Sequence, residues 1–244
     1  MAVAAVAASS VIHVNFANGT AVGIAVPSYI ATIRYEQYGS TLCTGSLIAP
    51  RFVLTTVNCI EKAKWVTINA NTRVGVEGEH IRVLQWFNHP KNTKNTTAID
   101  VGVLLLEQDS QNQPATLDFT TYPPGTSVIV RGYGRLGYDG GASTFLREAN
   151  GTIMANGECN KDLFNDNMMC IVGVSLCNGD LGAPVTVTKD QHDVVIAQAS
   201  WIFRHCSGSY GVYSNLGAAK DFLGSFLPGG DVCKQNMQRP SLNP

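Results

Sequence analysis

The ten residues "LCNGDLGAPV" (176–185) decide the fold of this 244-residue chain. A cysteine is followed by a Gly-Asp pair, and Gly182 and Pro184 come after one intervening residue each. Glycine and proline at this spacing mark a tight loop. The residue at its centre, Leu181, has no heteroatom. The sequence therefore predicts a tight loop with an apolar side chain at its centre.

Short strand signals recur on both sides of this loop and predict an all-β sandwich or barrel. They cover residues 29–36, 46–56 (two strands across an Ala-Pro turn), 65–70, 80–87, 101–107, 127–134, 183–188 and 194–203. Gly, Pro, Asn and Asp separate them, and no βαβ alternation appears. Apolar spacing predicts one helix over 216–227, which a Pro-Gly-Gly stop ends. Residues 231–244 have little to bury, so a mobile tail is expected there.

The composition excludes several classes of partner. Lys and Arg number 17 against 18 Asp and Glu, and no basic run is long enough for nucleic acid. No run of about 18 apolar residues exists, so no membrane partner is expected. The chain has neither CxxC pairs nor His-x-His sets, so neither a metal nor another cofactor is predicted.

The cysteines and sequons favour a secreted, disulfide-bonded protein. The seven cysteines are 43, 59, 159, 170, 177, 206 and 233. Asn-x-Ser/Thr sequons at Asn18, Asn95 and Asn150 are possible N-glycosylation sites. The small apolar start "MAVAAVAASS" is typical of part of a secretory leader, so we interpret residues 1–15 as a signal remnant or N-terminal extension.

Four segments, in order, resemble the trypsin/chymotrypsin family of serine proteases. "LCTGSLIAPRFVLTTVNC" (42–59) is similar to the strand pair that ends in Ala-Ala-His-Cys, and "AIDVGVLLLE" (98–107) to the segment with the catalytic aspartate. "CNGDLGAPV" (177–185) is similar to the serine loop, and "ASWIFRHCSGSYGVYSNL" (199–216) to the wall of the primary pocket.

This resemblance implies two packed six-stranded antiparallel β-barrels with a C-terminal helix, in a domain over residues 16–230. It also implies the disulfides Cys43–Cys59, Cys159–Cys170 and Cys177–Cys206. Cys233 is left over in the tail (231–244), either as a thiol or as a bridge to another chain.

The same resemblance implies that the catalytic machinery is lost. The family's histidine position is Asn58 and its serine position is Leu181, while Asp100 keeps the aspartate position. An amide is not a base at neutral pH, and leucine cannot attack a carbonyl. We therefore expect an inactive protease homologue, in which the Asn58 amide donates to the Asp100 carboxylate.

No other histidine is expected to restore the chemistry. His13 and His80 lie outside the family segments, and His192 follows a polar turn. His89, in "FNHP", is predicted in a surface turn, and His205 stands beside Cys206.

Two further positions differ from the family. Ile202 follows Trp201 where the family keeps glycine, and Ser175 replaces an acid at the base of the primary pocket. The counterpart of the family's activated N-terminus is "FANG" (16–19), which follows Asn15 rather than Lys or Arg. We therefore expect Asp180 to find its hydrogen bonds within a zymogen-like loop.

A protease homologue without catalytic groups is expected to bind proteins. Within the family, the chain is most similar to glucanase inhibitor proteins, which plant-pathogenic oomycetes such as Phytophthora secrete against host endo-β-1,3-glucanases. The resemblance implies an apoplastic effector of that kind. Another protein-binding or immune-regulatory role is the alternative, and an enzyme with a substitute nucleophile is the least favoured reading.

Overall fold

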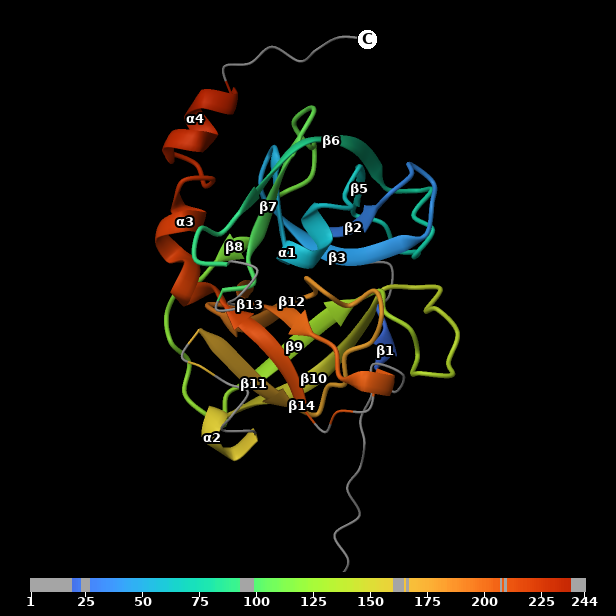
Figure 1. Ribbon diagram of the computed structural model, residues 1–244, viewed down its shortest axis with the longest axis vertical. Coiled ribbons are helices and arrows are strands. Elements are labelled where there is room, and N and C mark those ends of the chain that lie inside the picture. The colour runs from blue at the N-terminus through green and yellow to red at the C-terminus, as the bar shows by residue number, and fades with distance from the viewer. Residues whose placement is uncertain are drawn as a thin grey trace, which may run out of the picture.

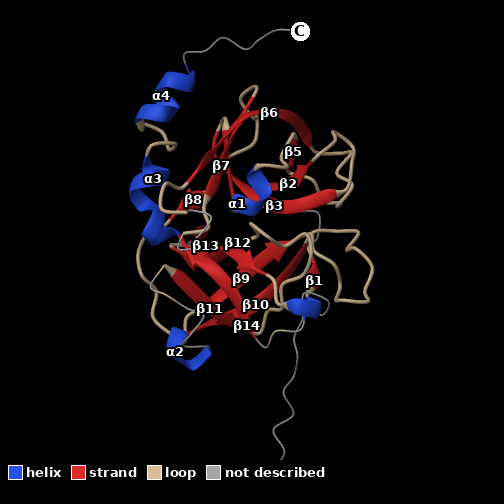
Figure 2. Cartoon of the chain, viewed as in Figure 1, coloured by secondary structure: helices blue, strands red, loops and turns tan. Residues whose placement is uncertain are grey.

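The chain folds into two β-barrels packed one on the other, with short helices at the periphery (Figures 1 and 2). The computed structural model describes residues 19–22, 27–92, 99–159, 165, 167–206, 208 and 210–237. The predicted all-β fold with two six-stranded antiparallel barrels and a short C-terminal helix is confirmed.

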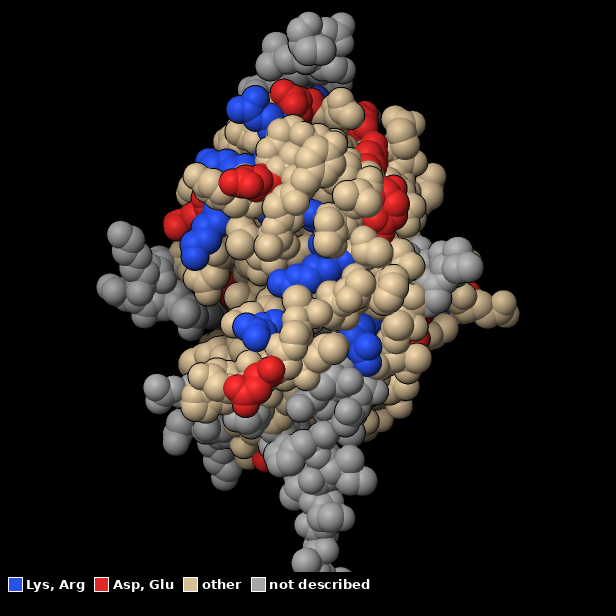
Figure 3. Space-filling model, turned by 90° about the vertical axis from the view of Figure 1, so that its right-hand side faces the viewer, with Lys and Arg blue, Asp and Glu red and all other residues tan. Residues whose placement is uncertain are grey.

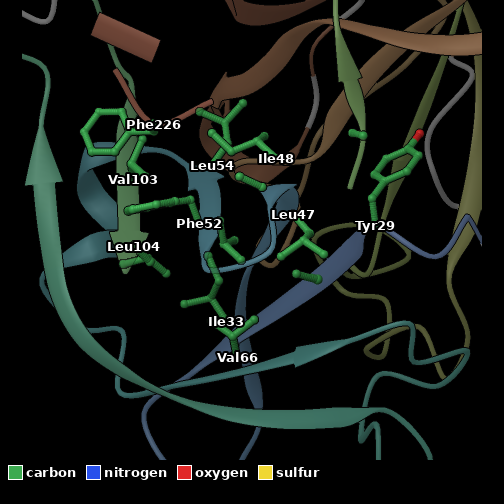
Figure 4. Close-up of a cluster of buried hydrophobic side chains, with 14 of the residues drawn as sticks. Tyr29, Ile33, Leu47, Ile48, Phe52, Leu54, Val66, Val103, Leu104 and Phe226 are labelled. Atoms are coloured by element: carbon green, nitrogen blue, oxygen red, sulfur yellow. The ribbon is translucent and has the colours of Figure 1, made fainter. Parts of the chain in front are cut away.

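The first barrel closes in the order β2-β3-β4-β7-β6-β5. Its strands are β2 (Ile30–Arg34), β3 (Thr41–Ala49), β4 (Phe52–Thr55), β5 (Trp65–Ile68), β6 (Glu79–Asn88) and β7 (Gly102–Leu106). Aliphatic side chains of all six strands fill the interior together with Phe226, and Figure 4 shows part of this cluster. Each such side chain contributes about 1.5–3 kcal/mol on burial, so this core fixes the barrel.

The second barrel closes through β9, β10, β11, β14, β13 and β12. Their bounds are β9 (Ser127–Gly132), β10 (Arg147–Met154), β11 (Met168–Val172), β12 (Pro184–Lys189), β13 (His192–Trp201) and β14 (Tyr210–Asn215). β1 (Thr20–Ala21) adds to β10, and β8 (Thr116–Leu117) pairs in parallel with β13.

The strand signals were not complete. Each predicted segment contains a strand, but β10, β11 and β14 lie outside them, as do the two-residue strands β1 and β8. The β10 sequence "REANGTIM" includes Glu, Asn and Gly, which are poor strand formers. It is a strand because β9 and β11 pair with its two edges. Strand propensity along the sequence does not include this pairing.

The helices are short. They are α1 (Val57–Ile60), α2 (Asn156–Cys159), the 3₁₀ turns η2 (Arg204–Cys206) and η3 (Leu216–Ala219), α3 (Lys220–Gly224) and α4 (Asp231–Met237). The helix predicted over 216–227 is therefore split between η3 and α3. Phe226, just beyond α3, still reaches the first barrel, where its ring centroid lies 5.4 Å from that of Phe52.

The prediction of a mobile tail is wrong for residues 231–237. These residues form α4, and Cys233 is only 2% exposed. The buried guanidinium of Arg51 donates from Nη1 to the carbonyl of Asn236 over 2.9 Å, which fixes the helix on the first barrel. The prediction missed this contact because it is made 185 residues away along the chain. Residues 238–244 lie outside the described residues.

The three disulfides that the resemblance implied are confirmed: Cys43–Cys59, Cys159–Cys170 and Cys177–Cys206. The bridge to another chain through Cys233 has no support, because its thiol is buried, and burial also raises its pKa. No helix among the described residues is long and apolar enough to cross a membrane.

One face of the molecule carries both signs of charge (Figure 3). Lys and Arg lie mainly across its middle, and Asp and Glu lie mainly above them. This mixture agrees with the near-zero net charge of the sequence.

Candidate functional site

The loop around Leu181 joins the two barrels. The Gly182 amide donates to the Ala199 carbonyl on β13, and the Thr44 amide on β3 donates to the Leu181 carbonyl over 2.9 Å. Gly182 has φ +80°, and a Cβ there would lie 2.2 Å from the Thr44 carbonyl oxygen. The glycine is therefore required by the contact between the barrels as well as by the turn.

Asp180 is completely buried beneath this loop. Its Oδ1 accepts from the Gly134 amide over 2.7 Å, and its Oδ2 accepts from the Cys177 amide over 2.9 Å. Burial raises the pKa of Asp180 to about 7, against the lowering effect of the two amides and of Arg73. The expected hydrogen bonds of Asp180 are thus present; the "FANG" segment, except Gly19, lies outside the described residues.

Arg73 supports the same loop from the first barrel. Its Nη1 donates to the Tyr133 carbonyl over 2.5 Å and its Nη2 to the Thr41 carbonyl over 3.0 Å. The Arg73 guanidinium of the first barrel therefore lies close to the buried Asp180 carboxylate of the second barrel. Its two hydrogen bonds also link the backbones of the two barrels.

Leu181 faces a cleft of about 520 Å³ at the junction of the barrels. The cleft is lined by Leu42, Cys43, Val57, Asn58, Cys59, Glu61, Lys62 and Leu181. Leu181 is half-buried and packs against the first-barrel core. Asn58 is exposed on α1. The two positions that the resemblance assigned to the family's histidine and serine thus line one cleft.

Asp100 lies on the other side of Asn58 and is 7% exposed. Its Oδ1 accepts from the Val57 amide over 2.8 Å, and its Oδ2 accepts from the Ser200 hydroxyl over 2.7 Å. Burial raises its pKa, against the lowering effect of these two donors.

The predicted hydrogen bond from the Asn58 amide to the Asp100 carboxylate is absent from the described part of the chain, so this prediction is wrong. In the described residues the donors to the carboxylate are the Val57 amide and the Ser200 hydroxyl. The exposed Asn58 side chain makes no hydrogen bond to Asp100 among the described residues. Ser200 was missed, although it directly precedes Trp201 in the segment that carried the resemblance.

A second cavity of about 200 Å³ adjoins the cleft and shares two of its lining residues. It is lined by Val57, Asn58, Asn92, Asp100, Met168, Ser200 and Trp201. Asn92, Met168 and Trp201 were not predicted as site residues. No local signal marks Asn92 or Met168, which come from separate parts of the chain.

The two positions that the resemblance assigned to the primary pocket lie on the second barrel. Ser175 is buried, and its hydroxyl donates to the Gly208 carbonyl over 2.5 Å. Ile202 is half-buried and packs against the second-barrel core. Their effect on substrate entry stays a prediction.

The described histidines do not line either cavity. The turn predicted at His89 is present, since the Asn92 amide donates to the His89 carbonyl over 2.9 Å. Its predicted surface position is wrong, because His89 is 5% exposed and lies edge-to-face with Phe222 of α3. His80 contacts Thr67, and His205 packs on Tyr138. His13 lies outside the described residues.

The described residues contain no cluster of three or more His, Cys, Asp or Glu side chains suited to a metal ion. Of the sequons, Asn150 is exposed on β10, and its occupancy stays a prediction. Asn18 and Asn95 lie outside the described residues.

Comparison with known proteins agrees with this architecture. A model of the trypsin family matches residues 18–223. The chain is 31% identical to glucanase inhibitor protein 3 of Phytophthora infestans over 227 residues, which cover 85% of this chain and 88% of that protein. Glucanase inhibitor protein 1 of the same organism is 30% identical over 241 residues, or 92% and 93%.

A chymotrypsin of Phaedon cochleariae is 28% identical over 216 residues, which cover 81% of this chain and 76% of that enzyme. Both inhibitors and an enzyme are therefore similar to the chain. Overall sequence identity does not distinguish the two activities, so the residues of the cleft have to be considered. The match over most of the length, together with the two closed barrels, shows that the chain belongs to the trypsin family.

Proposed function

We propose that this protein is a secreted, non-catalytic member of the trypsin family that binds and inhibits a plant endo-β-1,3-glucanase. One observation supports the non-catalytic part: Asn58 and Leu181 line the same cleft. The resemblance assigns these two positions to the family's base and nucleophile. Acyl transfer needs a hydroxyl or thiol to attack and an imidazole to accept its proton.

The remaining carboxylate does not replace these groups. Asp100 is buried and already accepts bonds from Val57 and Ser200, so in the fold it acts as a structural acceptor. Among the residues that line the cleft, Glu61 and Lys62 are exposed charged side chains, and neither supplies a nucleophilic hydroxyl or thiol. A protein of this kind is suited to binding, because loops on a rigid scaffold lose little conformational entropy on docking.

The partner is inferred from the relatives. Four glucanase inhibitor proteins of Phytophthora infestans are 30–31% identical to this chain over most of its length. Three disulfides support an extracellular location, where such bonds form and persist. The role that follows is protection of a pathogen's wall glucan in the host apoplast.

The non-catalytic part is tested with a serine-directed fluorophosphonate and a broad panel of peptide substrates. No labelling and no turnover are expected. Turnover that persists through purification and is abolished by a point substitution in the cleft would overturn this part of the proposal.

The partner is tested by mixing the protein with plant family-17 endo-β-1,3-glucanases and measuring laminarin hydrolysis and complex formation on gel filtration. Dose-dependent inhibition is expected. A reduced and alkylated sample, which has the same sequence without its disulfides, is the control and should not inhibit. Full hydrolysis and no complex with several host isoforms contradict the glucanase assignment.

If the glucanase test fails and the cleft is still inert, another protein-binding or immune-regulatory role remains. A pull-down from host apoplastic fluid, compared with the alkylated control, identifies the partner in that case.

A further inference from the structure

The smaller cavity, between Asn58 and Trp201, contains an anionic group that the proposed function does not yet use. It has a volume of about 200 Å³, enough for one long side chain. Four of its lining residues are polar (Asn58, Asn92, Asp100 and Ser200), and Trp201 contributes an indole that is 45% exposed. The cavity therefore combines a carboxylate with an aromatic surface.

Asp100 has capacity for a further partner. An ionised carboxylate offers about four acceptor positions, and the structure fills two of them, through Val57 and Ser200. No Lys, Arg or His among the described residues forms an ion pair with Asp100. A buried carboxylate without a cation is strongly stabilised when one arrives.

Folding has already removed most water from this carboxylate. An incoming cation therefore has to offset mainly its own desolvation, a smaller cost than that of burying both charges together. A guanidinium is more weakly hydrated than an ammonium, is planar, and stacks on aromatic faces. These properties match a cavity that has Asp100 on one side and Trp201 on another.

We propose that the cavity between Asn58 and Trp201 receives an arginine side chain of the protein partner, whose guanidinium pairs with Asp100 and lies against the Trp201 indole. The neighbouring cleft, lined by Leu42, Val57 and Leu181, then accommodates apolar side chains next to that arginine. The arginine's source rests on the proposed function, since it requires a protein partner; the cation site itself does not.

The site is tested on the full chain without any partner. Methylguanidinium is titrated while the NMR signal of the Trp201 indole N–H is followed, with the signal assigned by Trp201→Phe. Saturable binding is expected in the millimolar range, and methylammonium is expected to bind more weakly. Absence of saturable binding, or tighter binding of methylammonium, overturns the proposal.

Three variants locate the binding. Asp100→Asn keeps the shape and removes the charge, so binding should weaken at least about tenfold. Asn58→His places an imidazole beside Asp100, which should fill the cavity and weaken binding similarly. Glu36→Gln removes an exposed carboxylate outside both cavities and should leave the affinity unchanged. Unchanged binding in either of the first two variants, or an equal loss in Glu36→Gln, overturns the assignment.

The same variants separate this proposal from the glucanase assignment. If wild type inhibits a glucanase, Asp100→Asn should inhibit it at least about tenfold less strongly, while Glu36→Gln inhibits as wild type does. Equal inhibition by Asp100→Asn overturns the arginine contact and leaves glucanase inhibition standing. If methylguanidinium binds but the protein inhibits no glucanase, the glucanase assignment is rejected and the cation site is retained.

Discussion

The Ser200 hydroxyl donates a 2.7 Å hydrogen bond to Oδ2 of Asp100, although the two residues are 100 positions apart and belong to different barrels. Asp100 precedes β7 in the first barrel, and Ser200 lies on β13 in the second. The bond therefore couples the two barrels beside the cavity that Asp100 and Ser200 line together.

Removal of this donor should destabilise the protein. Ser200→Ala leaves a buried carboxylate oxygen without its hydroxyl partner, which should lower the free energy of unfolding by about 1–3 kcal/mol. Urea denaturation at pH 7 measures it. Thr188→Ala deletes a comparable hydroxyl-to-carboxylate bond, to Asp193, at an exposed site, and should cost under about 0.5 kcal/mol. Equal effects of the two substitutions contradict the structural role of Ser200.

Asp180 should give stability a distinct pH dependence. Its folded pKa of about 7 lies above the ordinary value of 3.8, so the folded state holds more protons between these two values. The contribution of Asp180 to the free energy of unfolding is complete below about pH 4 and is lost as pH rises through about 7. At its steepest, the free energy of unfolding falls by about 1.4 kcal/mol per pH unit.

Urea denaturation from pH 4 to pH 8 checks this dependence. Asp180→Asn should reduce the slope, although the variant is less stable overall because its amide faces two backbone N–H donors. Asp139→Asn, at an exposed carboxylate, should retain the wild-type slope. An Asp180→Asn curve parallel to that of wild type would show that Asp180 is ionised throughout.

Gly182 should be irreplaceable for two separate reasons. Gly182→Ala combines a positive φ with a Cβ placed 2.2 Å from the Thr44 carbonyl oxygen, so a loss of about 3 kcal/mol or more is expected. Gly125 has φ +89° with nothing within 4 Å of its Cβ position, so Gly125→Ala should cost only about 1–2 kcal/mol. Thermal unfolding of both variants separates backbone strain from the clash between barrels; equal losses would exclude the clash.

Restoring the two lost side chains should not restore an enzyme. Asn58→His with Leu181→Ser supplies a base and a hydroxyl, but Ile202 and the absent cleavage site at "FANG" remain. Asp180 also remains bonded to Gly134 and Cys177. Fluorophosphonate labelling and peptide turnover should stay at background, and robust trypsin-like turnover in this double variant contradicts the expectation.

Cys233 should be unreactive in the folded protein. Its side chain is 2% exposed and burial raises the pKa of its thiol, so little thiolate is available to a disulfide reagent. Ellman's reagent at pH 7 should label the chain slowly, and rapidly only in urea. Rapid labelling of the native protein, or a covalent dimer on a non-reducing gel, would support the inter-chain bridge instead.

Several features of the molecule follow from local sequence. Gly182 and Pro184 mark a loop in the sequence. The apolar residues on the two sides of the turn at Pro50 predict the paired strands β3 and β4. The helix around Cys233 and the strand β10 could not be predicted, because packing partners far along the chain determine both.

The sequence by itself determined the all-β fold, the candidate disulfides through family likeness, and the absence of a hydroxyl at Leu181 and of an imidazole at Asn58. Chemical identity is local, so these losses can be read from the chain. Tertiary structure alone decided that Ser200 rather than Asn58 donates to Asp100, and that Trp201 lies beside the same cavity. Hydrogen bonding in a buried site depends on which groups the closed barrels bring within reach, and these groups come from distant strands.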